Sequence, residues 1–153
     1  MKFPSFKQIY DMAQYLQAGA RVYYHKETGE ILEYPVGIEE WYTEEEENPF
    51  QDVLDKVEAN PEDYVEIEPM YSREAYRIME RFAKEMIDDP EIKILALDRL
   101  AGPKPFRRFR DLVEYSDYRE SWFAFQQKAY EDYVRKILEL ELADDDDLDD
   151  GTE

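Results

Sequence analysis

Four positive side chains lie within seven residues of an otherwise acidic chain: Lys104, Arg107, Arg108 and Arg110. They fall at the start of a short helix that the residue spacing predicts over residues 103–114. The macrodipole of a helix disfavours positive charge near its N-terminus, by a few tenths to about 1 kcal/mol for each group. Free backbone N–H groups and arginine forks at such a place suit a negatively charged ligand. The pattern therefore predicts an anion-recognising or partner-binding surface, which we call the basic turn-helix.

Aromatic side chains are expected to hold this surface in place. At about 100° per residue, Phe106 and Phe109 share one face of the predicted helix, while Lys104, Arg107 and Arg108 project from the other. Trp122 follows on the next predicted helix, within a stripe typical of a buried core. We therefore assign Phe106, Phe109 and Trp122 a supporting role and the four cations the binding role.

A competing interpretation is ordinary structural pairing. Arg107 can pair with Asp111 one turn later, and the chain offers 39 acidic residues to the other cations. If an anion does bind, three ligands remain open: a phosphate or nucleotide-like molecule, an acidic patch on a partner protein, or the chain's own acidic residues 144–150.

Catalytic and metal-binding patterns are weak. His25 is the only histidine and there is no cysteine, so neither a catalytic triad nor a zinc site is expected. Residues 144–147 are four aspartates that do not match the calcium-binding loop of an EF-hand. With five glycines the chain has no glycine-rich phosphate loop. We expect no cofactor, no metal and no assignable catalytic residue; a hydrolase-type enzyme with unidentified carboxylates is the alternative.

The formal charge of −20 bears on the class of partner. Such a charge repels nucleic acids and anionic lipids at long range, so we expect neither non-specific nucleic-acid binding nor membrane binding. An acidic mimic of nucleic acid, bound to a DNA- or RNA-binding protein, is a further alternative. Without a cysteine, an apolar spanning segment or a signal-peptide pattern, the sequence predicts a cytoplasmic protein.

The N-terminal half combines helix and strand patterns. Ser5 can cap a helix over residues 6–17 with Phe6, Ile9, Tyr10, Ala13 and Leu16 buried. Two strand-like runs in residues 21–34 flank a short loop that places Gly29 at a positive φ, which predicts a hairpin. A helix follows from about residue 50 to 60, and residues 64–68 alternate like a third strand.

The C-terminal half is predicted to be helical. Ser72 is expected to cap one helix, Asp89–Pro90 to begin another that Gly102 ends, and the last helix to cover residues 117–140. Its apolar arc, which includes Leu140, is too wide for one packing face, so it is either sandwiched in a monomer, which we favour, or shared with a partner chain. The sequence thus predicts a single α+β domain over residues 1–142, with a small antiparallel sheet, followed by an acidic, disordered tail over residues 143–153.

The order of these motifs resembles a bacterial family of small proteins of unknown function. The most recognisable part is the glycine, Gly102, with the Phe-Arg-Arg-Phe-Arg-Asp run of residues 106–111, followed by a helix that contains Trp122. The likeness covers about residues 20–140 and departs from the family at the Glu-rich residues 39–48 and at the tail. The resemblance implies the fold and assigns no activity.

Overall fold

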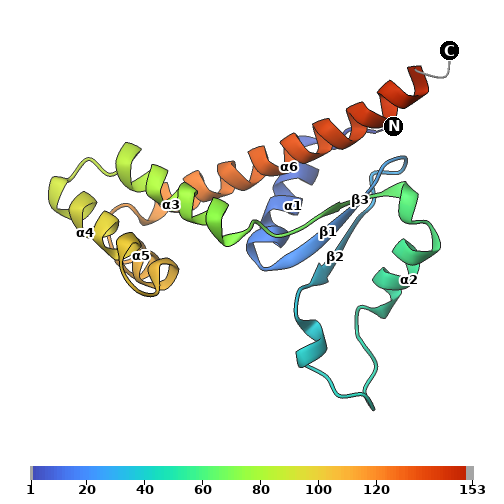
Figure 1. The fold of residues 1–153 in the computed structure, drawn as a ribbon, viewed down its shortest axis with the longest axis horizontal. Coiled ribbons are helices and arrows are strands. Elements are labelled where there is room, and N and C mark those ends of the chain that lie inside the picture. The colour runs from blue at the N-terminus through green and yellow to red at the C-terminus, as the bar shows by residue number, and fades with distance from the viewer. Residues whose placement is uncertain (1, 151–153) are drawn as a thin grey trace. The chain divides into compact units, whose positions relative to one another are not determined.

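The computed structural model describes the backbone of residues 2–150 and the side chains of residues 2–143. This part of the chain forms six α-helices, three strands and two short 3-10 helices (Figure 1), which is the α+β class that the sequence predicts. The helices are α1 (Phe6–Gln17), α2 (Gln51–Ala59), α3 (Ser72–Glu85), α4 (Pro90–Ala101), α5 (Pro105–Glu114) and α6 (Arg119–Asp150). The strands are β1 (Ala20–His25), β2 (Ile31–Pro35) and β3 (Tyr64–Ile67), and the 3-10 helices are η1 (Ile38–Glu40) and η2 (Pro61–Asp63).

The chain divides into two compact units. The sheet unit comprises Met1–Pro69 and Tyr130–Glu153, and the helical unit comprises Met70–Ala129. Helix α6 runs through both units, so the division does not decide whether residues 1–142 fold as one domain. The single domain that the sequence predicts stays a prediction. The predicted tail begins inside α6, whose backbone is described to Asp150, and its last residues, 151–153, lie outside the described residues.

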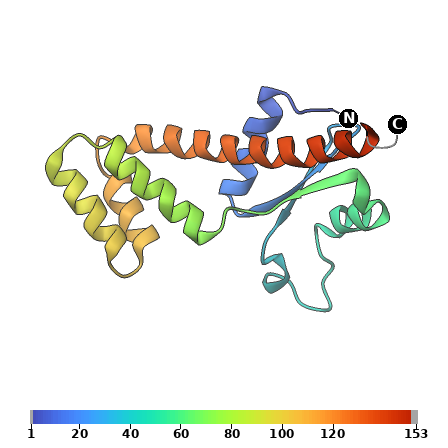
Figure 2. The same ribbon diagram turned by 45° about the horizontal axis from the view of Figure 1, so that its top comes forward.

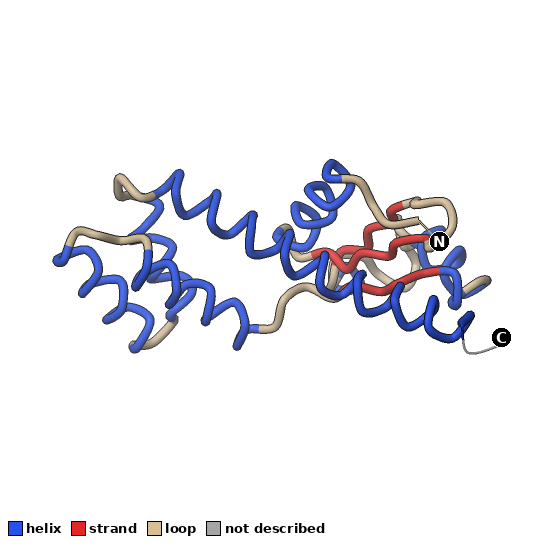
Figure 3. Tube along the Cα trace, turned by 90° about the horizontal axis from the view of Figure 1, so that it is seen from above, coloured by secondary structure: helices blue, strands red, loops and turns tan. Residues whose placement is uncertain are grey.

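The sheet is antiparallel in the order β2-β1-β3 (Figures 1 and 3), so the hairpin is joined by one later strand as expected. Tyr23 of β1 faces Leu32 of β2 and Glu66 of β3 in the register of the two pairings. Gly29 has a φ of 77°, which is the left-handed conformation that the sequence predicts for the hairpin loop.

Both faces of the sheet are covered by apolar side chains, because successive residues of a strand point to opposite faces. Val22 and Tyr24 of β1 pack against α1 and the C-terminal part of α6, whereas Tyr23 packs against η1 and α2. Figure 2 shows α1 and α6 on one side of the strands and α2 on the other. All three of these β1 side chains are therefore buried, and β1 is the central strand of a three-layered unit.

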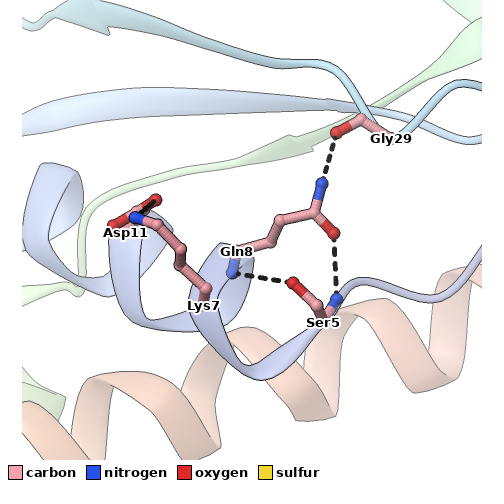
Figure 4. Close-up of polar contacts among 5 residues, drawn as sticks. All are labelled: Ser5, Lys7, Gln8, Asp11 and Gly29. Carbon is pink, nitrogen blue, oxygen red and sulfur yellow. Dashed lines mark hydrogen bonds and ion pairs between the residues drawn. The ribbon is translucent and has the colours of Figure 1, made fainter.

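Helix α1 is capped by Ser5, as the sequence predicts, and the cap is a complete capping box. The Gln8 backbone N–H donates to Ser5 Oγ at 3.2 Å, and the Ser5 N–H donates to Gln8 Oε1 at 2.9 Å (Figure 4). The Gln8 amide also donates to the carbonyl of Gly29 at 2.9 Å, which ties the helix to the hairpin loop. The predicted burial of Phe6 and Tyr10 is wrong: both are exposed, and Met12 fills the core instead.

The helical unit has its own core, built from α3, α4, α5 and the start of α6. The rings of Phe82 and Phe109 meet the Trp122 indole edge to face, at 5.3 and 5.2 Å between centroids. Asp89 caps α4 and Pro90 is its first residue, as predicted, but the N-cap of α3 is Tyr71 rather than Ser72. Since Ser72 already has helical geometry, its hydroxyl does not cap the helix.

Helix α6 contributes a different face to each core. Trp122 is buried in the helical unit, while Val134, Leu138 and Leu142 are buried in the sheet unit. The 12 residues from Trp122 to Val134 correspond to a rotation of about 120° around the helix. This rotation explains the wide apolar arc within one chain, and it leaves Leu140, which the sequence places in the core, exposed.

Candidate functional site: a basic turn-helix with an arginine-lined cavity

The basic turn-helix begins with an unusual residue. Lys104 is the N-cap of α5 and has a φ of 49°. Among the described residues, no other non-glycine residue has a positive φ. It precedes Pro105, whose ring disfavours the right-handed helical conformation in the preceding residue. Gly102 ends α4 as predicted, but in an extended conformation with a φ of −100°. The left-handed turn therefore falls on the lysine and not on the glycine.

The N-terminus of α5 receives no side-chain cap. Lys104 offers no acceptor, and no side chain hydrogen-bonds to the first turn of this helix. Pro105 at the first position has no N–H, so the open donors of this turn begin at Phe106. Positive side chains thus lie beside uncapped N–H groups, as the sequence predicts.

Three of the four cations are exposed. Lys104, Arg107 and Arg110 project into solvent, while Arg108 is half-buried. Within the part of the chain whose side chains are described, none of the four lies within 4.0 Å of a carboxylate oxygen. The pair between Arg107 and Asp111 is not formed. Docking of residues 144–150 onto these cations concerns side chains outside the described residues.

The aromatic residues lie on the opposite face of α5, as expected. Phe109 and Trp122 are buried and Phe106 is half-buried, all in the core of the helical unit. The Arg110 Nε–H donates to the carbonyl of Phe106 at 3.3 Å, which holds this side chain along its own helix. The amphipathic division of α5 thus turns the cations outward.

A cavity of about 330 Å³ adjoins the basic turn-helix, lined by Arg99, Arg108, Asp111 and Leu112. Arg99 belongs to the last turn of α4 and Arg108 to the first part of α5. The turn between these helices is short, so the end of one lies beside the start of the other (Figure 2). The sequence prediction missed Arg99, whose signal was its place in the turn that immediately precedes Gly102.

A second polar cluster joins the start of α6 to the turn between α3 and α4. The Tyr118 hydroxyl donates to the Asp88 carboxylate and accepts the Asp89 N–H at 3.1 Å. The hydrogen bond from Tyr118 lowers the pKa of Asp88, and the same bond raises the pKa of Tyr118. This carboxylate of the helical unit is thus stabilised chiefly by a phenol, with smaller contributions from backbone N–H groups and from Lys93.

Positive charge is concentrated in the helical unit. Residues 70–129 contain 12 bases and 11 acids, for a formal charge of +1, whereas the sheet unit contains 7 bases and 28 acids, for −21. The sequence prediction treated the charge of −20 as a property of the whole chain, because it placed no boundary near Met70. Counting charges by segment would have revealed the difference.

His25 lies in the hairpin and its ring stabilises the turn. Its Nδ1 accepts the N–H groups of Glu27 and Thr28, both at 3.1 Å. Over the described residues there is no group of three or more histidine or acidic side chains placed to hold a metal ion. Nor is any described helix long and apolar enough to cross a membrane.

Comparison with known proteins supports the predicted resemblance. A family model described as "Uncharacterised protein family (UPF0158)" matches residues 40–149, which include the basic turn-helix and Arg99. A UPF0158 protein of Pseudomonas aeruginosa is 25% identical over 84 residues, which cover 54% of each chain. This chain therefore spans about half the length of that curated relative, and no solved structure matches. The chain belongs to the UPF0158 family.

Proposed function

We propose that this chain is a non-enzymatic, cytoplasmic interaction protein whose basic turn-helix docks an acidic patch of a partner protein. The observation that carries the proposal is the absence of counter-charges: within residues 2–143, no carboxylate approaches Lys104, Arg107 or Arg110 to within 4.0 Å. Other exposed cations of the described residues, among them Arg73, Arg77 and Lys128, also lack a carboxylate within 4.0 Å, so these three are distinguished by their clustering beside uncapped N–H groups.

Several other cations of the chain do have acidic partners. Arg21 lies 2.9 Å from Glu68 and 3.2 Å from Glu66, and Lys56 lies 3.4 Å from Glu30. Two lysines pair with an acid one helical turn away: Lys7 with Asp11 and Lys84 with Glu80. Against this background, an acidic surface from another molecule would supply the charge that the basic turn-helix lacks.

A protein patch fits this surface better than a nucleic acid does. Duplex DNA carries a negative charge about every 1.7 Å, so a long duplex extends well beyond the basic turn-helix and is repelled by the net charge of the protein. A compact acidic patch needs to satisfy only these few cations. At physiological salt, repulsion between such a patch and the acids of this protein is largely screened at separations beyond about 8 Å.

Binding of a fluorescently labelled hexaglutamate peptide to the full chain tests the proposal by anisotropy. Exchanging Lys104, Arg107 and Arg110 together for glutamate should weaken binding at least about tenfold, because each exposed pair contributes up to about 1 kcal/mol and reversal adds repulsion. A hexaglutamine peptide should not bind.

The matched control is a second triple variant, Lys2→Glu/Lys7→Glu/Lys136→Glu, in exposed lysines of the sheet unit. It changes the net charge by the same amount and should change the Kd by less than about threefold. If both triple variants weaken binding equally, the peptide responds to total charge alone and the basic turn-helix is not the docking surface.

A further inference from the structure

We infer that the cavity between α4 and α5 is a carboxylate-binding site in which Arg99 and Arg108 clamp the bound group. The inference deepens the proposed function and rests on it in one respect, since Arg108 belongs to the basic turn-helix. Arg99 does not, and the cavity can therefore be tested separately from the exposed cations.

The size of the cavity suits a small ligand or a single side chain. Its volume of about 330 Å³ lies at the lower end of the range for small-molecule sites, roughly 300–1,000 Å³. Three of its four lining side chains are charged and one is apolar: Arg99, Arg108, Asp111 and Leu112. A ligand there would meet two guanidinium groups, one carboxylate and one aliphatic surface.

Both arginine residues are partly buried and lack a counter-ion within the described side chains. Arg99 and Arg108 are half-buried, and over residues 2–143 neither lies within 4.0 Å of a carboxylate oxygen. Arg21 of the sheet unit is half-buried as well, but two glutamates compensate its charge. Partial desolvation of an unpaired charge is unfavourable, and a bound anion would remove that cost.

Gly102 brings the Arg108 fork close to the backbone. A Cβ atom added at Gly102 would lie 3.2 Å from the Arg108 Nη1 atom, which is tighter than ordinary van der Waals contact. Because the φ of Gly102 is −100°, any residue could adopt this backbone conformation. A side chain at this position would therefore press on the Arg108 guanidinium, which packs against the end of α4.

The charges of the lining suit a single carboxylate group. Arg99 and Arg108 contribute two positive charges and Asp111 one negative charge, so the empty lining carries +1 and a carboxylate would neutralise it. A doubly charged phosphate would leave an excess negative charge beside Asp111. Guanidinium forks also match the two oxygens of a carboxylate, and Asp111 can accept a hydrogen bond from an N–H group on the same ligand.

NMR of the arginine Nε–Hε groups in the full chain tests this inference at constant ionic strength, with sodium glutarate as the probe. Glutarate carries two carboxylates, of which one enters the cavity and the other stays in solvent. Glutarate should shift the Arg99 and Arg108 signals together and saturably, with little change at Arg73, an exposed arginine of α3. Arg99→Gln should weaken glutarate binding at least about tenfold, and the control Arg73→Gln, with the same change of charge, by less than about twofold.

Two further probes distinguish the source and the class of the anion. If glutarate saturates the site, a free carboxylic acid suffices; if only the hexaglutamate peptide binds with the same dependence on Arg99, the carboxylate comes from a partner's side chain. Either result supports the inference. Equal glutarate affinity of wild type and Arg99→Gln would overturn the inference. It would also be overturned if inorganic phosphate bound the site more tightly than glutarate and displaced it.

A neutral triple variant separates this inference from the proposed function. Lys104→Gln/Arg107→Gln/Arg110→Gln removes the exposed cations and keeps Arg99 and Arg108. Glutarate binding should persist in it within about threefold, while hexaglutamate docking is lost. Loss of glutarate binding in this variant would show that the exposed cations, and not the cavity, hold the carboxylate.

Discussion

The two units of this molecule differ most in how they treat charge. The sheet unit carries −21 and compensates both of its arginines, Arg21 with Glu66 and Glu68 and Arg135 with Asp132. The helical unit carries +1 and leaves Arg99 and Arg108 unpaired within the described residues. A single value of −20 hides this division. Net charge therefore predicts the long-range field of this protein, whereas the chemistry of its surfaces has to be taken unit by unit.

The cores of the units differ as well. The helical unit is centred on aromatic rings, with Trp122 between Phe82 and Phe109, whereas the face of the sheet beneath α1 is mainly aliphatic. Both cores draw on α6. Whether the units unfold separately or together depends on how far that shared helix transmits the loss of one core to the other.

Truncating the two cores gives the largest expected effects. Trp122→Ala should destabilise the protein by about 3–5 kcal/mol and Leu138→Ala by about 2–5 kcal/mol, since both side chains are fully buried. Denaturation measures the total loss of folding free energy in each variant, and amide hydrogen exchange shows in which unit the loss occurs. Separate units predict that Trp122→Ala mainly affects Met70–Ala129 and that Leu138→Ala mainly affects the sheet unit. A uniform loss of protection in both variants would instead support the single domain predicted from the sequence.

Arginine substitutions sharpen the comparison at a smaller scale. Arg21→Gln leaves two carboxylates without their partner and should cost about 1 kcal/mol, an exposed-pair value because both glutamates are largely solvated. Arg108→Gln removes a charge that has no partner in residues 2–143, so its effect on the free energy of unfolding should stay within about 0.5 kcal/mol or be stabilising. Urea denaturation at low and high salt measures both. A larger loss for Arg108→Gln than for Arg21→Gln would mean that Arg108 is already compensated.

The elements that sequence alone predicted well are those set by neighbouring residues. The cap at Ser5, the left-handed Gly29 and the start of α4 at Asp89–Pro90 all depend on local geometry, and all are confirmed. Composition and motif order also sufficed for the fold class and the family.

The misses depend on tertiary structure. Leu140 fits the apolar stripe of α6, yet the buried face of that helix rotates between the units and leaves it in solvent. Lys104 takes a left-handed conformation that the sequence prediction did not assign to it. The cavity needed Arg99 as well as Arg108, and only the packing of α4 against α5 brings those residues together.

The smallest expected effect concerns an acid of the helical unit. Asp88 accepts a hydrogen bond from Tyr118, which lowers the pKa of this carboxyl, so the arrangement stabilises the fold above the ordinary aspartate range and loses that contribution as pH falls through the lowered pKa. Tyr118→Phe should therefore raise the pKa of Asp88 toward its ordinary value. The stability difference from wild type should be present at neutral pH and vanish in strong acid.

Carbon-detected NMR of the Asp88 carboxyl against pH measures this shift, and Tyr115→Phe is the matched control because Tyr115 is 91% exposed. If Asp88 titrates at the same pH in wild type and in Tyr118→Phe, another group stabilises its charge, and a cation of the helical unit becomes the first candidate. The cations of that unit would then be partly committed to its own acids, and the contrast with the sheet unit would weaken. A raised pKa in Tyr118→Phe alone would instead mean that a phenol stabilises this carboxylate, which leaves the positive side chains to an outside anion.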